Sequence, residues 1–252
     1  MQRDFDMITY KFPTDWDYVN LYPIACVHVG SPDFDERLWY KWKKTVMDDP
    51  KSGIILVGDI IDNGLKTSKT DSYRATLSPR EQKKWITDEL RPIREKILAG
   101  VEGNHEYRSV ASADDSPLYD IMCKLDKEDL FRENMGFLKV SVGRKSAERQ
   151  WAYGLALAHG VGKGKQNTFR YSIDNMDLFI TAHLHQAWLE FPSKYVMDLH
   201  NETVRKVGFK HLSLSSFTDG GYALKGMYAP QDNVFPIVKL NGKEKEVDIR
   251  WR

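Results

Sequence analysis

Short apolar runs that stop at glycine and polar residues mark the first part of the chain. Residues 21–28 form such a run, which ends at a Gly-Ser-Pro turn, and an amphipathic stretch follows from 33 to about 46. Residues 53–57 repeat the apolar run and lead into Gly58 and Asp59. The predicted order is therefore strand, loop, helix, and again strand and loop.

Apolar residues at helical spacing follow from 77 to 98, where Pro92 is expected to kink or divide the helix. Residues 96–101 lead into a third strand. Residues 115–132 form another helical region, which begins at a serine followed by a proline, a favoured helix start. The first half of the chain is thus predicted to alternate strands and helices.

After Gly136 the pattern changes to short apolar runs separated by tight turns, which we interpret as strands. These runs cover residues 137–142, 151–158, 178–182, 206–214, 235–240 and 244–251. The two halves together predict an α/β fold, a four-layer α/β/β/α sandwich of two mixed sheets flanked by helices. Because no repeat, low-complexity tract or linker interrupts the pattern, a single domain over residues 1–252 is expected.

Composition narrows the class of protein. Hydrophobic residues make up 41% and charged residues 29%, as in soluble globular proteins, and the net charge of +1 does not favour a general polyanion binder. Cys26 and Cys123 are far apart, which argues against a disulfide framework or a structural zinc cluster. Without a secretory signal or an apolar stretch of roughly 20 residues, we expect a cytoplasmic protein that makes no membrane contact.

Five of the seven histidines stand at the ends of predicted strands beside small residues. They are His28, His105, His159, His183 and His185. A single histidine in such a place is more often a hydrogen-bonded structural residue. Because α/β proteins place their chemistry at the carboxyl ends of strands, five together indicate a shared site.

Acidic and amide side chains occupy the same kind of position. Asp59 and Asp62 follow a buried strand and Asn104 follows the next one, although each alone could be a turn former or a helix cap. His183 and His185 are predicted to be alternate residues of a strand, which would direct both imidazoles to one face. Nitrogen and oxygen ligands of this mixture suit manganese, iron(II) or zinc better than calcium.

Taken in order, these motifs resemble the calcineurin-like metallophosphoesterase superfamily. The series is His28, Gly58-Asp-Ile-Ile-Asp62, Gly103-Asn-His-Glu106, His159 and His183-Leu-His185, and it spans residues from about 22 to 186. Any one of these motifs is a weak signal, whereas five in order are a strong one. The resemblance implies the four-layer sandwich with two metal ions at the strand ends.

The resemblance also implies a role for each position. One metal ion would be held by Cys26, His28, Asp59 and His185, and the other by Asp59, Asn104, His159 and His183, so that Asp59 bridges the two. His105 would stand beside the leaving-group oxygen as proton donor or electrostatic stabiliser, and Asp62 would orient its ring. Two divalent ions can share and activate a hydroxide and neutralise the phosphate oxygens of an in-line displacement.

Cys26 departs from the family, which usually has an aspartate at this position. Three interpretations stay open. Cys26 could ligate as a thiolate, which favours zinc or iron over manganese. It could be a buried apolar residue, with the first metal held weakly or supported by Asp33 or Asp35. The chain could also be a relative that kept the fold and binds a ligand without turnover.

Basic and aromatic residues near the motifs indicate the substrate. Lys163 and Lys165 follow His159 in a glycine-rich loop and are predicted to bind substrate phosphate. Several aromatic residues near the motifs could stack a base, although most aromatic residues are core. They are Trp85, Tyr107, Phe169, Tyr171, Trp188 and Tyr222.

We therefore expect a metal-dependent phosphoester hydrolase, a phosphodiesterase acting on a nucleotide or nucleic acid, with two divalent metal ions (Mn²⁺, Fe²⁺ or Zn²⁺) as cofactors. One alternative is a phosphomonoesterase, including a protein phosphatase. The other is a non-catalytic nucleotide or nucleic-acid binder with an altered metal site. Some bacterial and bacteriophage members of the superfamily have a similar size and plain architecture, which favours a microbial or viral source.

Overall fold

Two six-stranded sheets form the centre of the computed structural model, which describes residues 4–66, 68, 73–144, 146, 149–221, 224, 227 and 232–252. The first sheet has the order β14 (Val247–Trp251), β13 (Pro236–Asn241), β2 (Tyr18–Ile24), β3 (Ser52–Val57), β4 (Ile97–Val101) and β5 (Phe131–Arg132). Strands β2 to β5 pair in parallel, and β13 pairs antiparallel with both β2 and β14.

The second sheet has the order β1 (Ile8–Lys11), β6 (Met135–Val142), β7 (Trp151–Ala158), β8 (Leu178–Thr181), β12 (Lys210–Ser213) and β9 (Trp188–Glu190). Here β7, β8 and β12 are parallel neighbours, whereas β6 and β9 run antiparallel to β7 and β12. The parallel strands of both sheets matter most for the site, because their carboxyl ends lie at one edge.

The two sheets pack face to face over an apolar core. In β3, Ile55 and Val57 point into this core, while Ile54 and Leu56 point to the opposite face, as the two-residue period of a strand requires. On that opposite face lie α1 (Glu36–Asp48), α2 (Pro79–Leu90) and α4 (Pro117–Lys124). Because this strand is buried on both faces, its sequence is a continuous apolar run rather than an alternation of apolar and polar residues.

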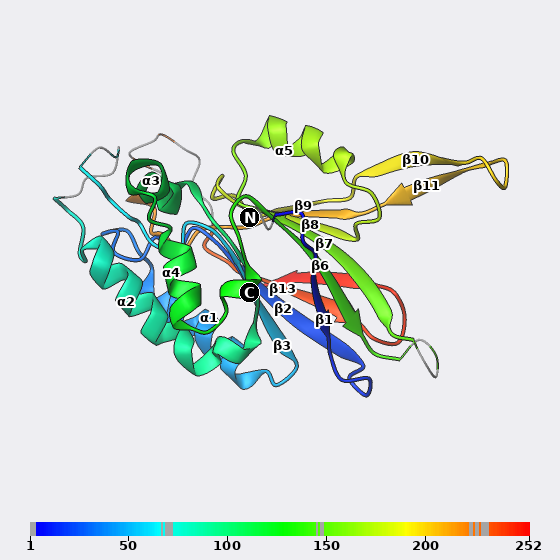
Figure 1. Cartoon of the computed structure of the whole chain (residues 1–252), viewed down its shortest axis with the longest axis horizontal. Helices are drawn as coiled ribbons and strands as arrows, with labels where there is room; N and C mark the ends of the chain where they lie inside the picture. The colour runs from blue at the N-terminus through cyan, green and yellow to red at the C-terminus, as the bar shows by residue number, and fades with distance from the viewer. Residues whose placement is uncertain are drawn as a thin grey trace.

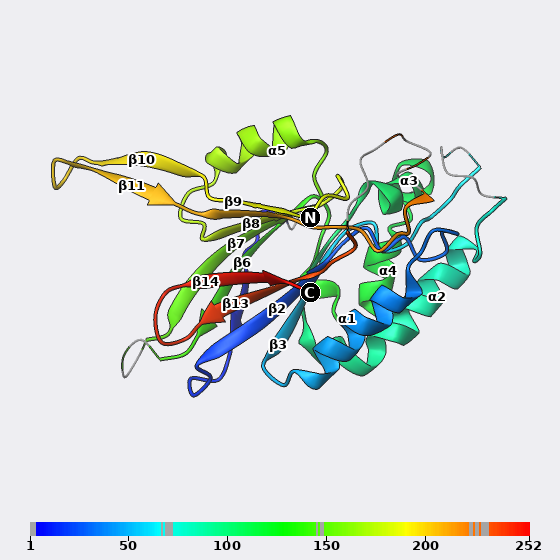
Figure 2. The same cartoon turned by 180° about the vertical axis from the view of Figure 1, so that it is seen from behind.

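The predicted four-layer order is confirmed, with unequal outer layers (Figures 1 and 2). Three helices cover the first sheet. The outer face of the second sheet carries a smaller apolar cluster and is flanked by the short α5 (Lys163–Phe169) and the 3-10 helix η3 (Arg170–Ser172). Within the described residues, no helix has both the length and the apolar character that crossing a membrane requires.

Some predicted elements are wrong in extent. The helix expected over 115–132 ends at Lys124, because Asp126 takes a left-handed conformation with φ 58°, and 3-10 helix η2 (Glu128–Leu130) and β5 follow. The division of the earlier helix at Pro92 is confirmed, since α2 gives way to the 3-10 helix η1 (Arg91–Lys96).

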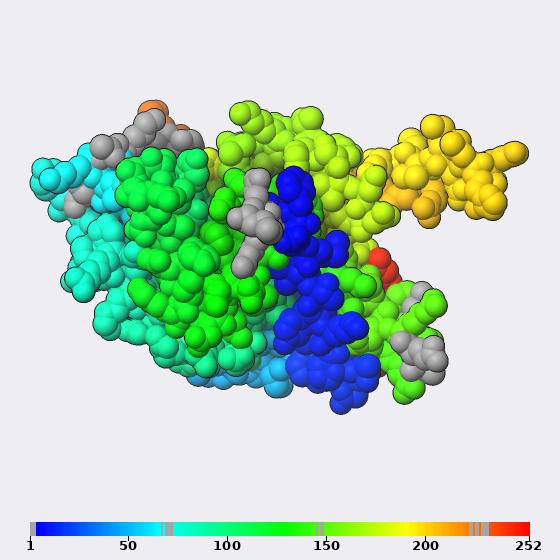
Figure 3. Space-filling model, in the orientation of Figure 1, coloured from blue at the N-terminus to red at the C-terminus, as the bar shows by residue number. Residues whose placement is uncertain are grey.

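Other elements differ from the prediction. Helix α3 (Asn104–Ala113) begins at the Asn-His motif, where a helix cap was one alternative, although the cap residue is Gly103 rather than Asn104. Helix α5 replaces the glycine-rich loop expected around Lys163 and Lys165. The run 206–214 is divided between β12 and β11 (Thr203–Gly208), which pairs with β10 (Ser193–Asp198). This hairpin projects from the body of the molecule (Figures 1 and 3).

Candidate metal centre

All seven predicted metal ligands follow strands whose carboxyl ends meet at one edge of the sandwich. Three of these strands belong to the first sheet and two to the second. The residues are Cys26 and His28 after β2, Asp59 after β3, Asn104 after β4, His159 after β7, and His183 and His185 after β8. The fold therefore brings side chains from five separate segments to one place.

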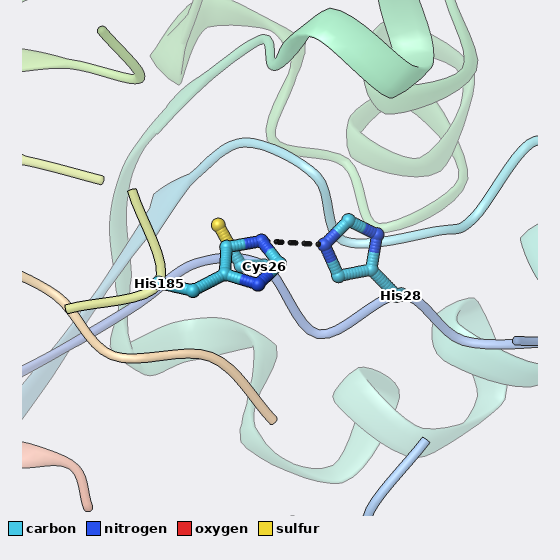
Figure 4. A group of neighbouring side chains, drawn as sticks. All are labelled: Cys26, His28 and His185. Carbon is cyan, nitrogen blue, oxygen red and sulfur yellow. Dashed lines mark hydrogen bonds between the residues drawn. The ribbon is translucent and has the colours of Figure 1, made fainter. Parts of the chain in front are cut away.

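Cys26, His28 and His185 form the first group of potential ligands. One donor atom from each lies within 4.8 Å of the other two. The Nε2 atoms of His28 and His185 face one another at 3.2 Å, with the Cys26 sulfur beside them (Figure 4). Two imidazole nitrogens bound to one ion at about 2.0–2.1 Å would stand roughly 3.0–3.4 Å apart, so this spacing suits a shared cation.

Asp59, Asn104, His159 and His183 form the second group. The Oδ2 atom of Asp59 lies 3.1 Å from His159 Nε2, which is also 3.1 Å from Asn104 Oδ1. His183 Nδ1 lies 2.8 Å from the same Asn104 oxygen. Cys26 is also within 4.8 Å of donor atoms on Asp59 and His159, so Asp59 and Cys26 lie between the two groups.

The protonation of His159 provides a test of whether a cation fits here. Its Nδ1 is 2.8 Å from the carbonyl oxygen of Val57, which can only accept, so Nδ1 carries a proton. The Nε2 atom then faces the oxygens of Asp59 and Asn104, and a lone pair in that position would be repelled by both. A cation between them, either a proton or a metal ion, removes the repulsion. Donation of the second imidazole N–H to a backbone carbonyl is usual in metal-ligating histidines.

Left-handed backbone conformations recur among the same residues. Cys26, His28, Asp59, His183 and His185 have φ values of 50°, 52°, 53°, 70° and 56°, in the left-handed region that side chains with a Cβ avoid. Each such conformation costs on the order of 1–3 kcal/mol and persists only where surrounding structure imposes it. Five of the seven candidate ligands share this conformation. Because His183 and His185 lie beyond the end of β8 and both are left-handed, the prediction that they are alternate residues of a strand is wrong.

Burial holds most of the histidines of the centre in the neutral form that binds metals. Burial and neighbouring histidines keep the pKa of His28 well below its ordinary value, lower that of His183, and bring that of His185 to about 4. For His159 burial acts in the same direction, but Asp59 outweighs it and raises the pKa. A carboxylate beside His159 therefore attracts positive charge at this point.

Cys26 has 0% of its surface exposed and packs in the core between the sheets. Burial, and then the charge of Asp59, raise the pKa of its thiol well above the ordinary range. The two carboxylates considered as substitutes lie elsewhere: Asp35 caps α1 by accepting from the Leu38 N–H at 3.0 Å, and Asp33 lies beside Gly221. Within the described part of the chain, neither belongs to a group of potential ligands.

His105 and Asp62 lie beside the centre, as the motifs predict. The Nδ1 atom of His105 is 2.7 Å from the Asp62 carbonyl oxygen and 3.4 Å from its carboxylate, and Nε2 is 3.9 Å from Asp59 Oδ2. The ring is therefore held mainly by the backbone carbonyl of Asp62 rather than by its side chain. Burial would lower the pKa of His105, but Asp59 and Asp62 outweigh burial and raise it.

Arg108 was not identified from the sequence. Its Nη2 donates to His105 Nε2 at 2.9 Å and its Nη1 donates to the Asp62 carbonyl oxygen at 3.1 Å. The guanidinium thus lies directly beside the predicted proton donor. The signal available in the sequence was its spacing, because residues three apart on a helix share a face.

Glu106 positions the ligand loops. Its buried carboxylate accepts hydrogen bonds from four backbone N–H groups, those of Asp59 at 2.8 Å, Ile60 at 2.7 Å, Ile61 at 3.2 Å and Gly103 at 3.1 Å. The loops after β3 and β4 are thereby fastened together. A Cβ on Gly103 would lie 2.2 Å from Asp59 Oδ1, so only glycine permits this approach.

The two predicted substrate lysines lie in different surroundings on α5. Lys163 lies 4.0 Å from Glu190 and 5.3 Å from the centre of the Trp188 ring. Lys165 instead lines a cavity beside Asn104 and His159, together with Tyr107 and Phe169.

The other aromatic candidates lie in different places. Trp85 packs against the core beneath the first sheet, and Trp188 contacts His211. Tyr171 contacts Phe209. Tyr222 lies outside the described residues.

No protein-family model matches the chain, and no curated protein matches it by sequence. Solved structures do match by fold. They include a metallophosphoesterase from Sphaerobacter thermophilus (11% identity, TM-score 0.42, covering 88% of this chain and 83% of that one). Vacuolar Protein Sorting 29 from Cryptosporidium parvum matches with 12% identity and a TM-score of 0.46, covering 94% and 98%.

A third match is Vps29 from Entamoeba histolytica, solved in complex with Zn²⁺ (12% identity, TM-score 0.40, covering 93% of this chain and 98% of that one). At these identities and TM-scores the likeness is one of fold alone, and no residue role is taken from it.

Proposed function

We propose that this protein is a metal-dependent phosphoester hydrolase whose substrate is a phosphodiester of a nucleotide or nucleic acid. The observation that carries the proposal is the meeting of seven potential ligands from five strand ends, with left-handed backbone at five of them.

The residues present fit two divalent cations. Cys26, His28, Asp59 and His185 would hold one, and Asp59, Asn104, His159 and His183 the other. Bound there, the cations would supply Lewis-acid chemistry, lowering the pKa of a water and neutralising phosphate oxygens.

In this proposal Asp59 serves both groups, since its carboxylate lies within 4.8 Å of donor atoms of Cys26, His28 and His159. Its Oδ1 accepts from the His105 backbone N–H at 2.8 Å, and its Oδ2 faces His159. The backbone N–H groups of Asp59 and Ile60 donate hydrogen bonds to the Glu106 carboxylate, which holds the Asp59 loop in this position. The chain therefore holds this carboxylate in one orientation before any substrate arrives, which is the preorganisation that catalysis requires.

His105 and Arg108 act on the leaving-group side in this proposal. With Nδ1 donating to Asp62, the Nε2 atom of His105 accepts from Arg108, so the positive charge nearest the ring is the guanidinium. We assign to Arg108 the binding of a phosphoryl oxygen, for which its planar donors are suited. Release of that hydrogen bond frees His105 Nε2 to take up a proton from solvent and then pass it to the departing oxygen.

A non-catalytic binder is the second candidate, and Cys26 is the observation that favours it. Without a cation, burial and the charge of Asp59 raise the pKa of the buried Cys26 thiol, so a metal ion would have to displace its proton in order to bind the sulfur. If Cys26 stays a thiol, the first group has one ligand fewer.

The test is hydrolysis by protein stripped of metal and reconstituted anaerobically with manganese, iron(II), zinc or magnesium. An activated aryl phosphodiester and the matching monoester serve as substrates, and Asp59→Asn and His183→Ala as controls. Diester turnover that requires metal and disappears in both variants supports the proposal. Preference for the monoester supports a phosphomonoesterase, and metal binding without turnover supports the non-catalytic binder.

A further inference from the structure

A cavity of about 820 Å³ opens on the outer face of the second sheet, within the range of roughly 300–1,000 Å³ usual for small-molecule sites. Its floor is formed by Met135 of β6, Ala158 of β7 and Phe179 of β8. Tyr107 of α3 and Phe169 of α5 stand at its sides. We call this space the apolar cavity.

The apolar cavity is continuous with the candidate metal centre. Asn104 and His159, two of the candidate ligands, belong to its wall. Tyr107 follows Asn104 by three residues on α3, so both side chains lie on the same side of that helix. A phosphate bound at the centre would therefore have the apolar cavity within reach of the group esterified to it.

The walls indicate what that group is. Tyr107 and Phe169 keep 58% and 45% of their surface exposed, although rings of this size are usually buried. Polar side chains of Asn134, Lys165 and Thr168 line the same space. A saturated chain would remove water from these polar groups without replacing its hydrogen bonds, at a cost in free energy. A flat heteroaromatic ring could contact the aromatic side chains and hydrogen-bond through its edge.

We propose that the apolar cavity binds the nucleobase of the substrate. The inference rests on the proposed hydrolase function and names the part of the nucleotide that the protein recognises. Tyr107 and Phe169 contact the faces or edges of the ring, and Met135, Ala158 and Phe179 form its apolar support. Recognition of this kind distinguishes bases only weakly, because every base has a π-face.

Equilibrium binding tests the proposal without requiring turnover. Isothermal titration of the manganese-loaded protein compares adenosine 5′-monophosphate, ribose 5-phosphate and octyl phosphate. The first two share the sugar and the phosphate and differ in the base. Since stacking of a base contributes roughly 1–3 kcal/mol, we expect adenosine 5′-monophosphate to bind about tenfold more tightly than ribose 5-phosphate, or better.

Two variants and a matched control test whether the preference for adenosine 5′-monophosphate over ribose 5-phosphate arises in the apolar cavity. Phe169→Ala removes an aromatic wall. Gly164→Leu adds a side chain from α5 at a wall residue where a Cβ meets nothing within 4 Å, so the helix accommodates it. Tyr171→Ala removes an exposed aromatic residue of η3 that contacts Phe209 and is not among the residues lining the cavity in the described chain.

We expect the preference for adenosine 5′-monophosphate to fall below about threefold in both cavity variants and to persist in Tyr171→Ala. Equal binding of the two sugar phosphates by the unmodified protein, undetectable binding of adenosine 5′-monophosphate, or an unchanged preference in both cavity variants would overturn the proposal. Tighter binding of octyl phosphate would also overturn it and indicate an alkyl site. Base-dependent binding in a protein that hydrolyses no phosphoester would support the cavity assignment and contradict the hydrolase function.

Discussion

The Nε2 atom of His28 lies 3.2 Å from the Nε2 atom of His185, although the two residues are 157 positions apart in the chain. Burial lowers the pKa of both rings, to about 4 for His185, so both are neutral at physiological pH. Cys26 completes this group from the same loop as His28 (Figure 4). The arrangement directs three donor atoms at one point, as a metal site requires.

Replacing Cys26 tests which metal this group prefers. We expect Cys26→Asp to strengthen manganese binding relative to zinc by about tenfold or more, because a carboxylate is a harder ligand than a thiolate. Competition with a chromophoric chelator measures both affinities. Cys123→Ser is the matched control, since Cys123 is the other free cysteine and lies on α4. An unchanged ratio of affinities in Cys26→Asp would show that the thiol is not a ligand.

Arg108 is expected to contribute to turnover through the phosphate. Arg108→Ala should lower kcat/KM by about 10²–10³-fold, the usual effect of removing one donor to a developing charge. Arg108→Lys should recover only part of the loss, because a lysine cannot reproduce the two donors that contact His105 and Asp62. Steady-state kinetics on an aryl phosphodiester measures both. If Arg108→Ala retains full kcat/KM, Arg108 has no role in the reaction.

Glu106 is expected to be important for stability as well as for metal binding. Glu106→Ala leaves four backbone N–H groups without their acceptor, and each unsatisfied buried group costs about 1–3 kcal/mol. We predict a loss of at least about 3 kcal/mol in the free energy of unfolding, measured by urea denaturation of metal-free protein.

Asp88→Ala is the control for this measurement. Asp88 forms an exposed ion pair with Lys84, and removal of such a pair should change stability by less than about 1 kcal/mol. Equal effects of the two substitutions would contradict the positioning role of Glu106.

His211 should make stability depend on pH. It is buried, and burial followed by the charge of Arg170 lowers its pKa to about 4, although Glu190 acts in the opposite direction. Because the folded-state pKa lies below the unfolded value of about 6.5, the unfolded chain binds more protons between those values. The stabilisation from neutral His211 is therefore complete above pH of about 6.5 and is lost as the pH falls towards 4, by up to about 3 kcal/mol.

His211→Gln keeps a polar side chain without this titration, so its free energy of unfolding should fall less over the same interval. Urea denaturation at a series of pH values measures the difference between the two proteins. His200→Gln, at an exposed position between β10 and β11, is the control. Parallel pH profiles for the unmodified protein and His211→Gln would contradict the prediction.

The strand ends were predictable because burial and chemistry both leave a signal in the sequence there. The runs before Asp59 and Asn104 are apolar because β3 and β4 are covered on both faces, and a polar residue directly after such a run stands out. The position of Asn104 and His159 relative to one another depends on how two separate sheets pack. Only the motif series, not periodicity, indicated that relationship.

The parts that were missed lack such a signal. Helix α3 carries serines and alanines whose apolar periodicity is weak, so only a possible helix cap was noted at its start, and Arg108 was overlooked. Helix α5 contains a glycine and few apolar residues, and it was expected to be a loop. The apolar cavity forms between α3, α5 and the second sheet, and its walls come from segments far apart in the chain. Its existence follows from packing that local sequence does not determine.

The central claim is that two metal ions sharing Asp59 support phosphoester hydrolysis. The most direct test is to titrate metal-free protein with one metal while turnover of an aryl phosphodiester is followed. Two sites sharing Asp59 predict that turnover rises with added manganese, iron(II) or zinc, levels off near two equivalents per chain, and is absent at every ratio in Asp59→Asn. Protein that binds two equivalents of metal and hydrolyses neither diester nor monoester would contradict the account.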